Sequence, residues 1–92
     1  MDFDWDKFKA DNNKIKHGVS FELAARVFLD SSRIEAYDDR ESYGEDRWVT
    51  IGAVSQAVLY VVYTVRDGDI IRIISARKAN ERERKKYGQV HA

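Results

Sequence analysis

The spacing of apolar residues changes along this chain, and each spacing predicts a different kind of element. One stripe repeats at three- and four-residue intervals and consists of Phe21, Ala24, Ala25 and Phe28. This spacing forms one apolar helix face, and Ser20 directly before it is a favoured helix N-cap. We predict a core-packing helix from Ser20 to about residue 30.

An earlier segment, residues 7–16, also has helix-forming composition, but Phe8 and Ile15 are its only large apolar residues. Asp6 caps the start of this predicted helix, and Gly18 ends it in the left-handed conformation. A helix with so thin an apolar stripe is mostly solvated. We therefore expect it to lie at the surface.

From residue 33 onward the pattern predicts strands. Residues 33–37 alternate between apolar and polar, the period of a strand with one solvated face, and residues 57–65 are dense in Val, Leu and Tyr, as in a strand covered on both faces. Four strands are predicted, at residues 33–37, 47–54, 57–65 and 70–77. The connections between them are a charged loop at 38–46, a turn at 55–56 and an Asp-Gly hairpin at 66–69. Outside these strands we expect a short strand or extended arm at 3–5, a helix capped by Asn80 at 81–87, and a frayed end at 90–92.

The element order β-α-α-β-β-β-β-α predicts the α+β class, with a small antiparallel sheet on one side and helices on the other. Ninety-two residues make a single domain, 1–92. The longest uncharged run, residues 48–65, is interpreted as two strands and not as a membrane span. We therefore expect no membrane partner.

Composition narrows the compartment and the chemistry. The chain has no cysteine, which fits a reducing cytoplasm, and its acidic first residues do not resemble a leader peptide. Its two histidines, His17 and His91, belong to no cluster with metal-ligand spacing, and no nucleotide-binding or serine-hydrolase motif occurs. We expect no metal and no cofactor.

The distribution of charged residues along the chain has two interpretations. The net charge is zero, which disfavours a general nucleic-acid binder. Residues 1–47 nevertheless hold eight Lys/Arg against twelve Asp/Glu, whereas residues 66–92 hold eight against four. Such a division predicts either a basic face for an anionic partner or two halves that pair with each other in the fold.

The residues left for chemistry are cations with a few proton carriers. The candidate cations are Lys16, Arg47, Arg72 and Arg77, and the candidate proton carriers are His17, Glu45 and Tyr87. The planar fork of arginine suits two phosphate oxygens, and a histidine or carboxylate suits general acid–base work. Each residue also has a structural interpretation, as a paired arginine, a histidine at a helix C-terminus, a solvated glutamate or a tyrosine over the core.

Arg72 and Arg77 raise a geometric question of their own. They lie five residues apart, so strict strand alternation places them on opposite faces of the sheet. They share one site only if a bulge intervenes or if Arg77 lies beyond the end of the strand.

Three segments, together with the opening Phe-Asp-Trp-Asp at residues 3–6, resemble the BrnT family of toxins. They are Asn13 to Glu22, Gly44 to Gly52, and Arg72 to Ala79 followed by Glu83, Arg84 and Tyr87. The resemblance implies a RelE-like fold and a ribonuclease toxin of a type II toxin–antitoxin system that cleaves RNA without the ribosome. It also implies a BrnA-like ribbon-helix-helix antitoxin as partner, whose DNA-binding domain brings the complex to its operator DNA.

By position, the resemblance implies a catalytic set of His17, Glu45, Arg72 and Arg77. It implies RNA-binding roles for Lys16, Arg47, Lys78 and Tyr87. Arg72 and Arg77 are expected to clamp the phosphate, and His17 or Glu45 to move protons during a metal-free attack by the 2′-hydroxyl. Lys7 and Lys78 depart from the residues common in relatives, proline and arginine, but neither departure removes a candidate site residue.

Two other functions remain open on the sequence. One is a catalytically inactive homologue that only holds its antitoxin, because the surface is of mixed sign and no acid–base pair is decisive. The other is a passive RNA binder, which the zero net charge disfavours.

Overall fold

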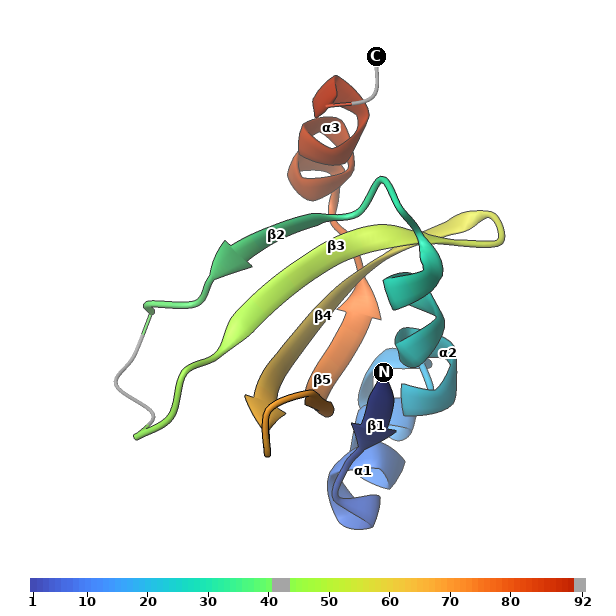
Figure 1. Cartoon of the computed structure of the whole chain (residues 1–92). Helices are drawn as coiled ribbons and strands as arrows, with labels where there is room; N and C mark the ends of the chain where they lie inside the picture. Colours follow the sequence, from blue (N-terminus) through green and yellow to red (C-terminus); the bar gives the residue numbers. More distant parts are fainter. Residues whose placement is uncertain (41–43, 91–92) are drawn as a thin grey trace.

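The structure is a computed structural model that describes residues 1–40 and 44–90 (Figure 1). Residues 41–43 of the predicted loop and residues 91–92 of the predicted frayed end lie outside the described residues. The elements in chain order are β1 (Asp2–Asp4), α1 (Lys7–His17), α2 (Phe21–Ala25), the 3-10 helix η1 (Arg26–Leu29), β2 (Ile34–Tyr37), β3 (Trp48–Val54), β4 (Ala57–Arg66), β5 (Ile70–Lys78) and α3 (Glu81–Val90).

The predicted element order is confirmed, with two local differences. The core helix changes from α-helix to 3-10 geometry at Arg26, and α3 continues to Val90, into the segment predicted to fray. The expected caps are present, since the Asp6 and Ser20 side chains accept hydrogen bonds from Lys9 N and Leu23 N.

The strands form one five-stranded sheet in the order β1-β5-β4-β3-β2. Strands β2 to β5 pair antiparallel with their sequence neighbours, as the meander predicted. The expectation of an antiparallel sheet is wrong for β1, which pairs parallel with residues 70–72 of β5. The chain leaves β1 into α1, so the rest of that β5 edge is free for the helix.

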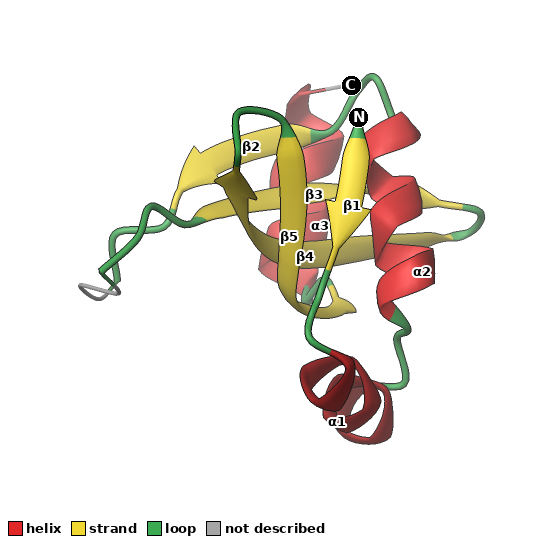
Figure 2. Ribbon diagram, turned by 60° about the horizontal axis from the view of Figure 1, so that its bottom comes forward, coloured by secondary structure: helices red, strands yellow, loops and turns green. Residues whose placement is uncertain are grey.

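Helices cover both faces of the sheet, so the prediction that they share one side is wrong for α3 (Figure 2). One face, here the α2 face, carries Leu59, Val61 and Tyr63 of β4 and packs against α2 and η1. The alternate residues of β4 point to the opposite face, here the α3 face, where the ring of Tyr87 from α3 packs. The sheet therefore has a small apolar cluster on each side.

Helix α1 lies along the edge of β5 that β1 leaves uncovered. Asn13 is buried there, and its side-chain amide bonds both backbone groups of Ala76, donating to the carbonyl at 2.7 Å and accepting from the N–H at 3.1 Å. As predicted, the outer side of α1 is solvated, with Phe8 and Ile15 exposed. None of the described helices is long and apolar enough to cross a membrane.

Candidate functional site

A β-bulge in β5 answers the question raised by Arg72 and Arg77. Arg77 lies opposite Tyr60 and Arg72 opposite Thr64, with the register shifting between Val62 and Tyr63 of β4. Residues 60 and 64 of a regular strand share a face, so both arginines project from the α3 face. Their backbone positions lie about 13 Å apart along the strand.

Arg77 is held by the C-terminal helix. Its guanidinium forms a two-pronged ion pair with the Glu83 carboxylate of α3, at 2.8 and 2.9 Å. The same group lies 3.9 Å above the centre of the Tyr60 ring, close enough for a cation–π contact. Hydrogen bonding to Arg77 lowers the pKa of Glu83 despite partial burial, so this carboxylate is charged at neutral pH.

Arg72 and Arg47 continue this cationic line towards the other end of the sheet. Arg72 pairs with Asp4 of β1 at 3.3 Å. Continuing the alternation of β3 by one residue places Arg47 on the same face, opposite Thr64. Arg47 is paired with Glu45 at 3.3 Å, so each of the three predicted arginines has a carboxylate of this chain beside it.

Glu45 lies at the end of this line of cations and is shared between two of them. Besides Arg47, its carboxylate lies 3.8 Å from Arg66 of β4. The next residue, Asp46, is held against the sheet, because the Thr64 hydroxyl donates a hydrogen bond to its carbonyl. Glu45 therefore lies on the α3 face. Its carboxylate pairs with arginines there and is also a candidate proton carrier.

His17 and Lys16 come from a different place, the C-terminal turn of α1. His17 is half-buried, Lys16 is exposed, and both lie one helical turn beyond Asn13, which is bonded to Ala76 next to Arg77. Within the described residues, no hydrogen bond or ion pair joins either side chain to Arg47, Arg72 or Arg77. The structure thus brings their helix against β5 without a direct link between the side chains.

Lys78 and Tyr87 do not join the line of arginines on the α3 face. Strand alternation turns Lys78 to the α2 face, opposite to Arg77, and its side chain is exposed. Tyr87 donates a 2.6 Å hydrogen bond to Asp30, at the end of η1. That bond raises the pKa of Tyr87, so the hydroxyl keeps its proton and ties α3 to the rest of the fold.

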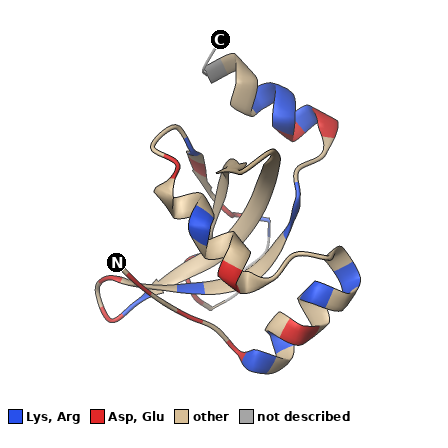
Figure 3. Cartoon of the chain, turned by 90° about the vertical axis from the view of Figure 1, so that its right-hand side faces the viewer, with Lys and Arg blue, Asp and Glu red and all other residues tan. Residues whose placement is uncertain are grey.

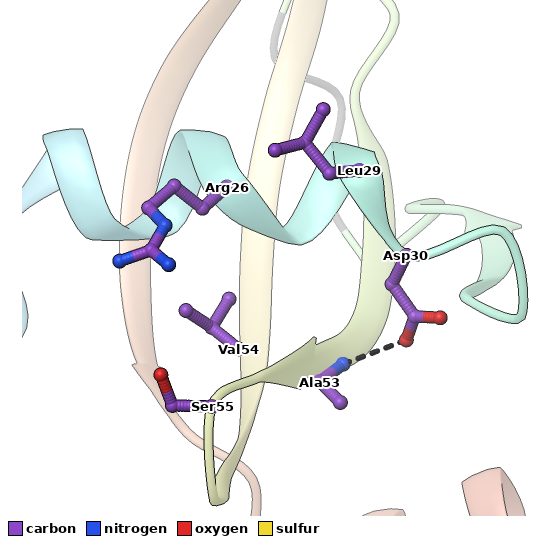
Figure 4. A pocket seen from close by; sticks show the side chains of 6 residues that line it. All are labelled: Arg26, Leu29, Asp30, Ala53, Val54 and Ser55. Carbon is purple, nitrogen blue, oxygen red and sulfur yellow. Dashed lines mark hydrogen bonds between the residues drawn. The ribbon is translucent and has the colours of Figure 1, made fainter.

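Several hollows lie on the described surface, and two of them bear on the candidate residues. One, of about 410 Å³, lies between α3 and the β2–β3 side of the sheet and includes Tyr60, Asn80 and Glu83 in its lining. Figure 3 shows the basic residues of α3 following an acidic start. The other, of about 290 Å³, lies between η1 and the β3–β4 turn, with Arg26, Leu29 and Ser55 around it (Figure 4). Of these two, the first is lined by the residues that contact Arg77.

Sequence reasoning missed the partners of the arginines. Asp4 and Glu83 were not among the candidate site residues, although each binds one of the predicted arginines. A signal for Glu83 was present, because Asn80 and Glu83 have the spacing of a capping box. Their reciprocal hydrogen bonds, at 2.9 and 2.8 Å, bring the Glu83 carboxylate back towards the end of β5.

Comparison with known proteins decides the family. A family model described as the ribonuclease toxin BrnT of a type II toxin–antitoxin system matches residues 5–83. The chain belongs to the BrnT family. It is similar to the crystal structure of the Brucella abortus ribonuclease toxin BrnT, with a TM-score of 0.67 and 25% sequence identity over 88% of this chain and 99% of that chain. The search of curated proteins gave no match.

BrnT membership confirms the resemblance, the RelE-like α+β fold and the ribonuclease toxin function expected from the sequence. A type II toxin implies an antitoxin as partner. The roles of individual site residues stay predictions.

Proposed function

We propose that this BrnT-family toxin cleaves RNA inside the strand by attack of a 2′-hydroxyl on the adjacent phosphorus, without a metal. In this reaction the 2′-oxygen forms a bond to phosphorus and the 5′-oxygen leaves, which yields a 2′,3′-cyclic phosphate and a 5′-hydroxyl end. A base takes the 2′ proton, an acid protonates the 5′-oxygen, and cations stabilise the charge that develops on phosphorus.

The observation that carries this proposal is the placement of Arg72 and Arg77 on one face by the bulge in β5. Arg77 gives a planar fork for two phosphate oxygens. Arg72 projects from the same face, with its backbone about 13 Å away along β5, and suits another phosphate of the same RNA chain. Arg47 is a third cation for the RNA backbone on the α3 face, and Lys16 and Lys78 contact the RNA beyond the edge of that face. Tyr87 acts indirectly, because its bond to Asp30 holds α3 beside the bound RNA.

The proton carriers are His17 and Glu45. Glu45 lies on the α3 face beside Arg47 and Arg66, and a carboxylate at this place can accept the 2′ proton of RNA bound to these arginines. It is therefore suited to act as the base. His17, half-buried at the end of α1, is the acid that reaches RNA seated against β5.

We further propose that the antitoxin is a BrnA-like ribbon-helix-helix protein, that operator DNA is contacted only through it, and that the toxin acts in the cytoplasm without a membrane partner. The family description supports an antitoxin of some kind. Co-purification of the toxin with the product of the neighbouring reading frame tests this part.

The decisive experiment for cleavage uses purified protein and a labelled RNA in excess EDTA. We expect cleavage, products with a 2′,3′-cyclic phosphate, and a loss of about 100-fold or more for Arg77→Ala. Arg26→Ala removes an arginine at the second hollow and serves as the matched control with normal activity. Strict dependence on a divalent metal, or full activity of Arg77→Ala, contradicts the proposal.

One observation favours a second function, that of an inactive homologue which only holds its antitoxin. Arg47, Arg72 and Arg77 are each paired with a carboxylate of this chain. Arginines that already have such partners do not need RNA to balance their charge. Expression without the antitoxin separates the two functions. An active toxin arrests growth and Arg77→Ala relieves the arrest, whereas an inactive homologue leaves growth unchanged.

A further inference from the structure

The Glu83 carboxylate occupies an anion site at the end of β5. Its two oxygens accept from both terminal nitrogens of Arg77, at 2.8 and 2.9 Å, and one of them also accepts from the backbone N–H of Asn80 at 2.9 Å. The donor set is a guanidinium fork and a backbone N–H at a helix start. These are also the donors that bind phosphate oxygens in proteins.

This carboxylate lies in the wall of the 410 Å³ cleft, bonded to Arg77. The lining of the cleft includes Glu83 and Tyr60, the two side chains that contact Arg77, but not Arg77 itself. The charged lining also includes Arg40, Arg82 and Lys86 together with Asp38 and Asp39, and Arg40 is paired with Asp38. Arg82 and Lys86, on the same helix as Glu83, add positive charge to the wall of the cleft, which favours an entering phosphate.

We propose that Glu83 is a positioning residue that competes with the RNA phosphate for Arg77, and that the cleft between α3 and β2–β3 is where this phosphate binds. The inference rests on the proposed function, since it takes Arg77 as the phosphate ligand. In the free protein Glu83 fills the site, and RNA binds by turning its carboxylate aside.

The exchange needs only a side-chain rotation. The backbone N–H of Glu83 donates to the Asn80 side chain at 2.8 Å, so the helix start keeps that capping bond when the carboxylate leaves. The Tyr60 ring holds the guanidinium from the other side. The arriving phosphate restores a negative charge at the positive end of the helix dipole.

The test measures binding of a short 2′-O-methyl RNA, which has no 2′-hydroxyl to react, by fluorescence anisotropy. Glu83→Gln keeps the capping hydrogen bonds but removes the charge. We expect it to bind about three- to tenfold more tightly than the wild type, as expected for loss of one partly exposed competing ion pair. With cleavable RNA the gain falls on KM and leaves kcat unchanged.

Glu81→Gln is the matched control, because it removes the same charge from the same helix turn while its partner is Lys85. We expect a change of less than twofold. Adding Arg77→Ala to Glu83→Gln abolishes the gain if the competition acts through Arg77. Should Glu83→Gln fail to fold, Glu83→Asp retracts the carboxylate by one methylene, and we expect a smaller gain in the same direction.

Weaker binding by Glu83→Gln, or an equal gain in Glu81→Gln, overturns the inference while leaving the proposed cleavage intact. Failure of the cleavage proposal has a different signature. In that case Arg77→Ala leaves both binding and cleavage at wild-type levels.

Discussion

Asn13 is the residue that joins helix α1 to the sheet. It is buried, and its amide donates to the Val19 carbonyl at 3.0 Å and to the Ala76 carbonyl at 2.7 Å while accepting from the Ala76 N–H. Beyond residues 70–72 no strand pairs with this edge of β5 among the described residues. One side chain thus satisfies backbone groups that a neighbouring strand would otherwise bind.

We expect Asn13→Ala to lower the free energy of unfolding by about 2–4 kcal/mol, because it leaves buried backbone groups without partners. Urea denaturation followed by tryptophan fluorescence measures the loss. Asn12→Ala, one residue earlier and exposed, is the control and is expected to change stability by less than about 0.5 kcal/mol. Equal midpoints for the two variants would show that the amide bonds contribute little.

At the scale of elements, the bulge in β5 decides which face Arg77 occupies. It could not be predicted from the sequence, because the strand carries isoleucine at positions 70, 71, 73 and 74. Apolar residues on both faces give no parity signal, so alternation alone could not locate the extra residue. The sequence therefore predicted the strand and its arginines but left their common face undecided.

Deleting Ile74 tests the bulge. The deletion removes the extra residue, so Ser75 follows Ile73 directly and Arg77 keeps its place opposite Tyr60 on the α3 face. Ile74 is half-buried, so its loss costs some apolar packing on that face, but we expect the variant to unfold cooperatively in urea. Ile74→Ala removes most of the same side chain and keeps the bulge, and we expect a similar midpoint. A deletion variant without a cooperative transition, beside an Ile74→Ala variant that has one, would contradict this pairing.

The other misplaced elements have physical reasons too. β1 has three residues, which is too short for a pattern to specify a parallel partner. Among the described side chains of helix α3, Tyr87 is the large apolar one that packs on the sheet, so the sequence pattern of this helix could not indicate a face. Two contacts hold this helix in place. Glu83 binds Arg77 at the end of β5, and Tyr87 binds Asp30, which is distant in the sequence. The caps, turns and antiparallel meander were predictable because their signals are local.

At the scale of the whole molecule, the two oppositely charged halves of the chain pair in part with each other. Asp4 binds Arg72 and Glu45 lies near Arg66, each pair joining the acidic half to the basic half. These pairs lie at the surface of the α3 face, where ion pairs contribute little to stability. The same arginines are therefore available to a stronger anion, so pairing in the free protein and binding of phosphate are compatible.

Three tyrosine hydroxyls that are bonded to carboxylates predict a loss of folding stability at alkaline pH. Burial and the Glu35 carboxylate raise the pKa of Tyr63 far above its ordinary value, and hydrogen bonds to Asp46 and Asp30 raise the pKa of Tyr37 and Tyr87. A raised pKa in the folded state means that the unfolded chain releases the proton first. The stabilisation is therefore complete below pH about 10 and is lost as pH rises further.

We expect the free energy of unfolding to fall above pH about 10, and Tyr63→Phe to make this decline shallower. Urea denaturation at pH 7, 9, 10 and 11 measures both slopes. Lysine deprotonation affects the two proteins alike, so the difference between them reports Tyr63. Between pH 7 and 9 their curves should run parallel, because the hydroxyl keeps its proton in both states. Identical slopes above pH 10 would show that the Tyr63 hydroxyl loses its proton equally easily in the folded and unfolded chain.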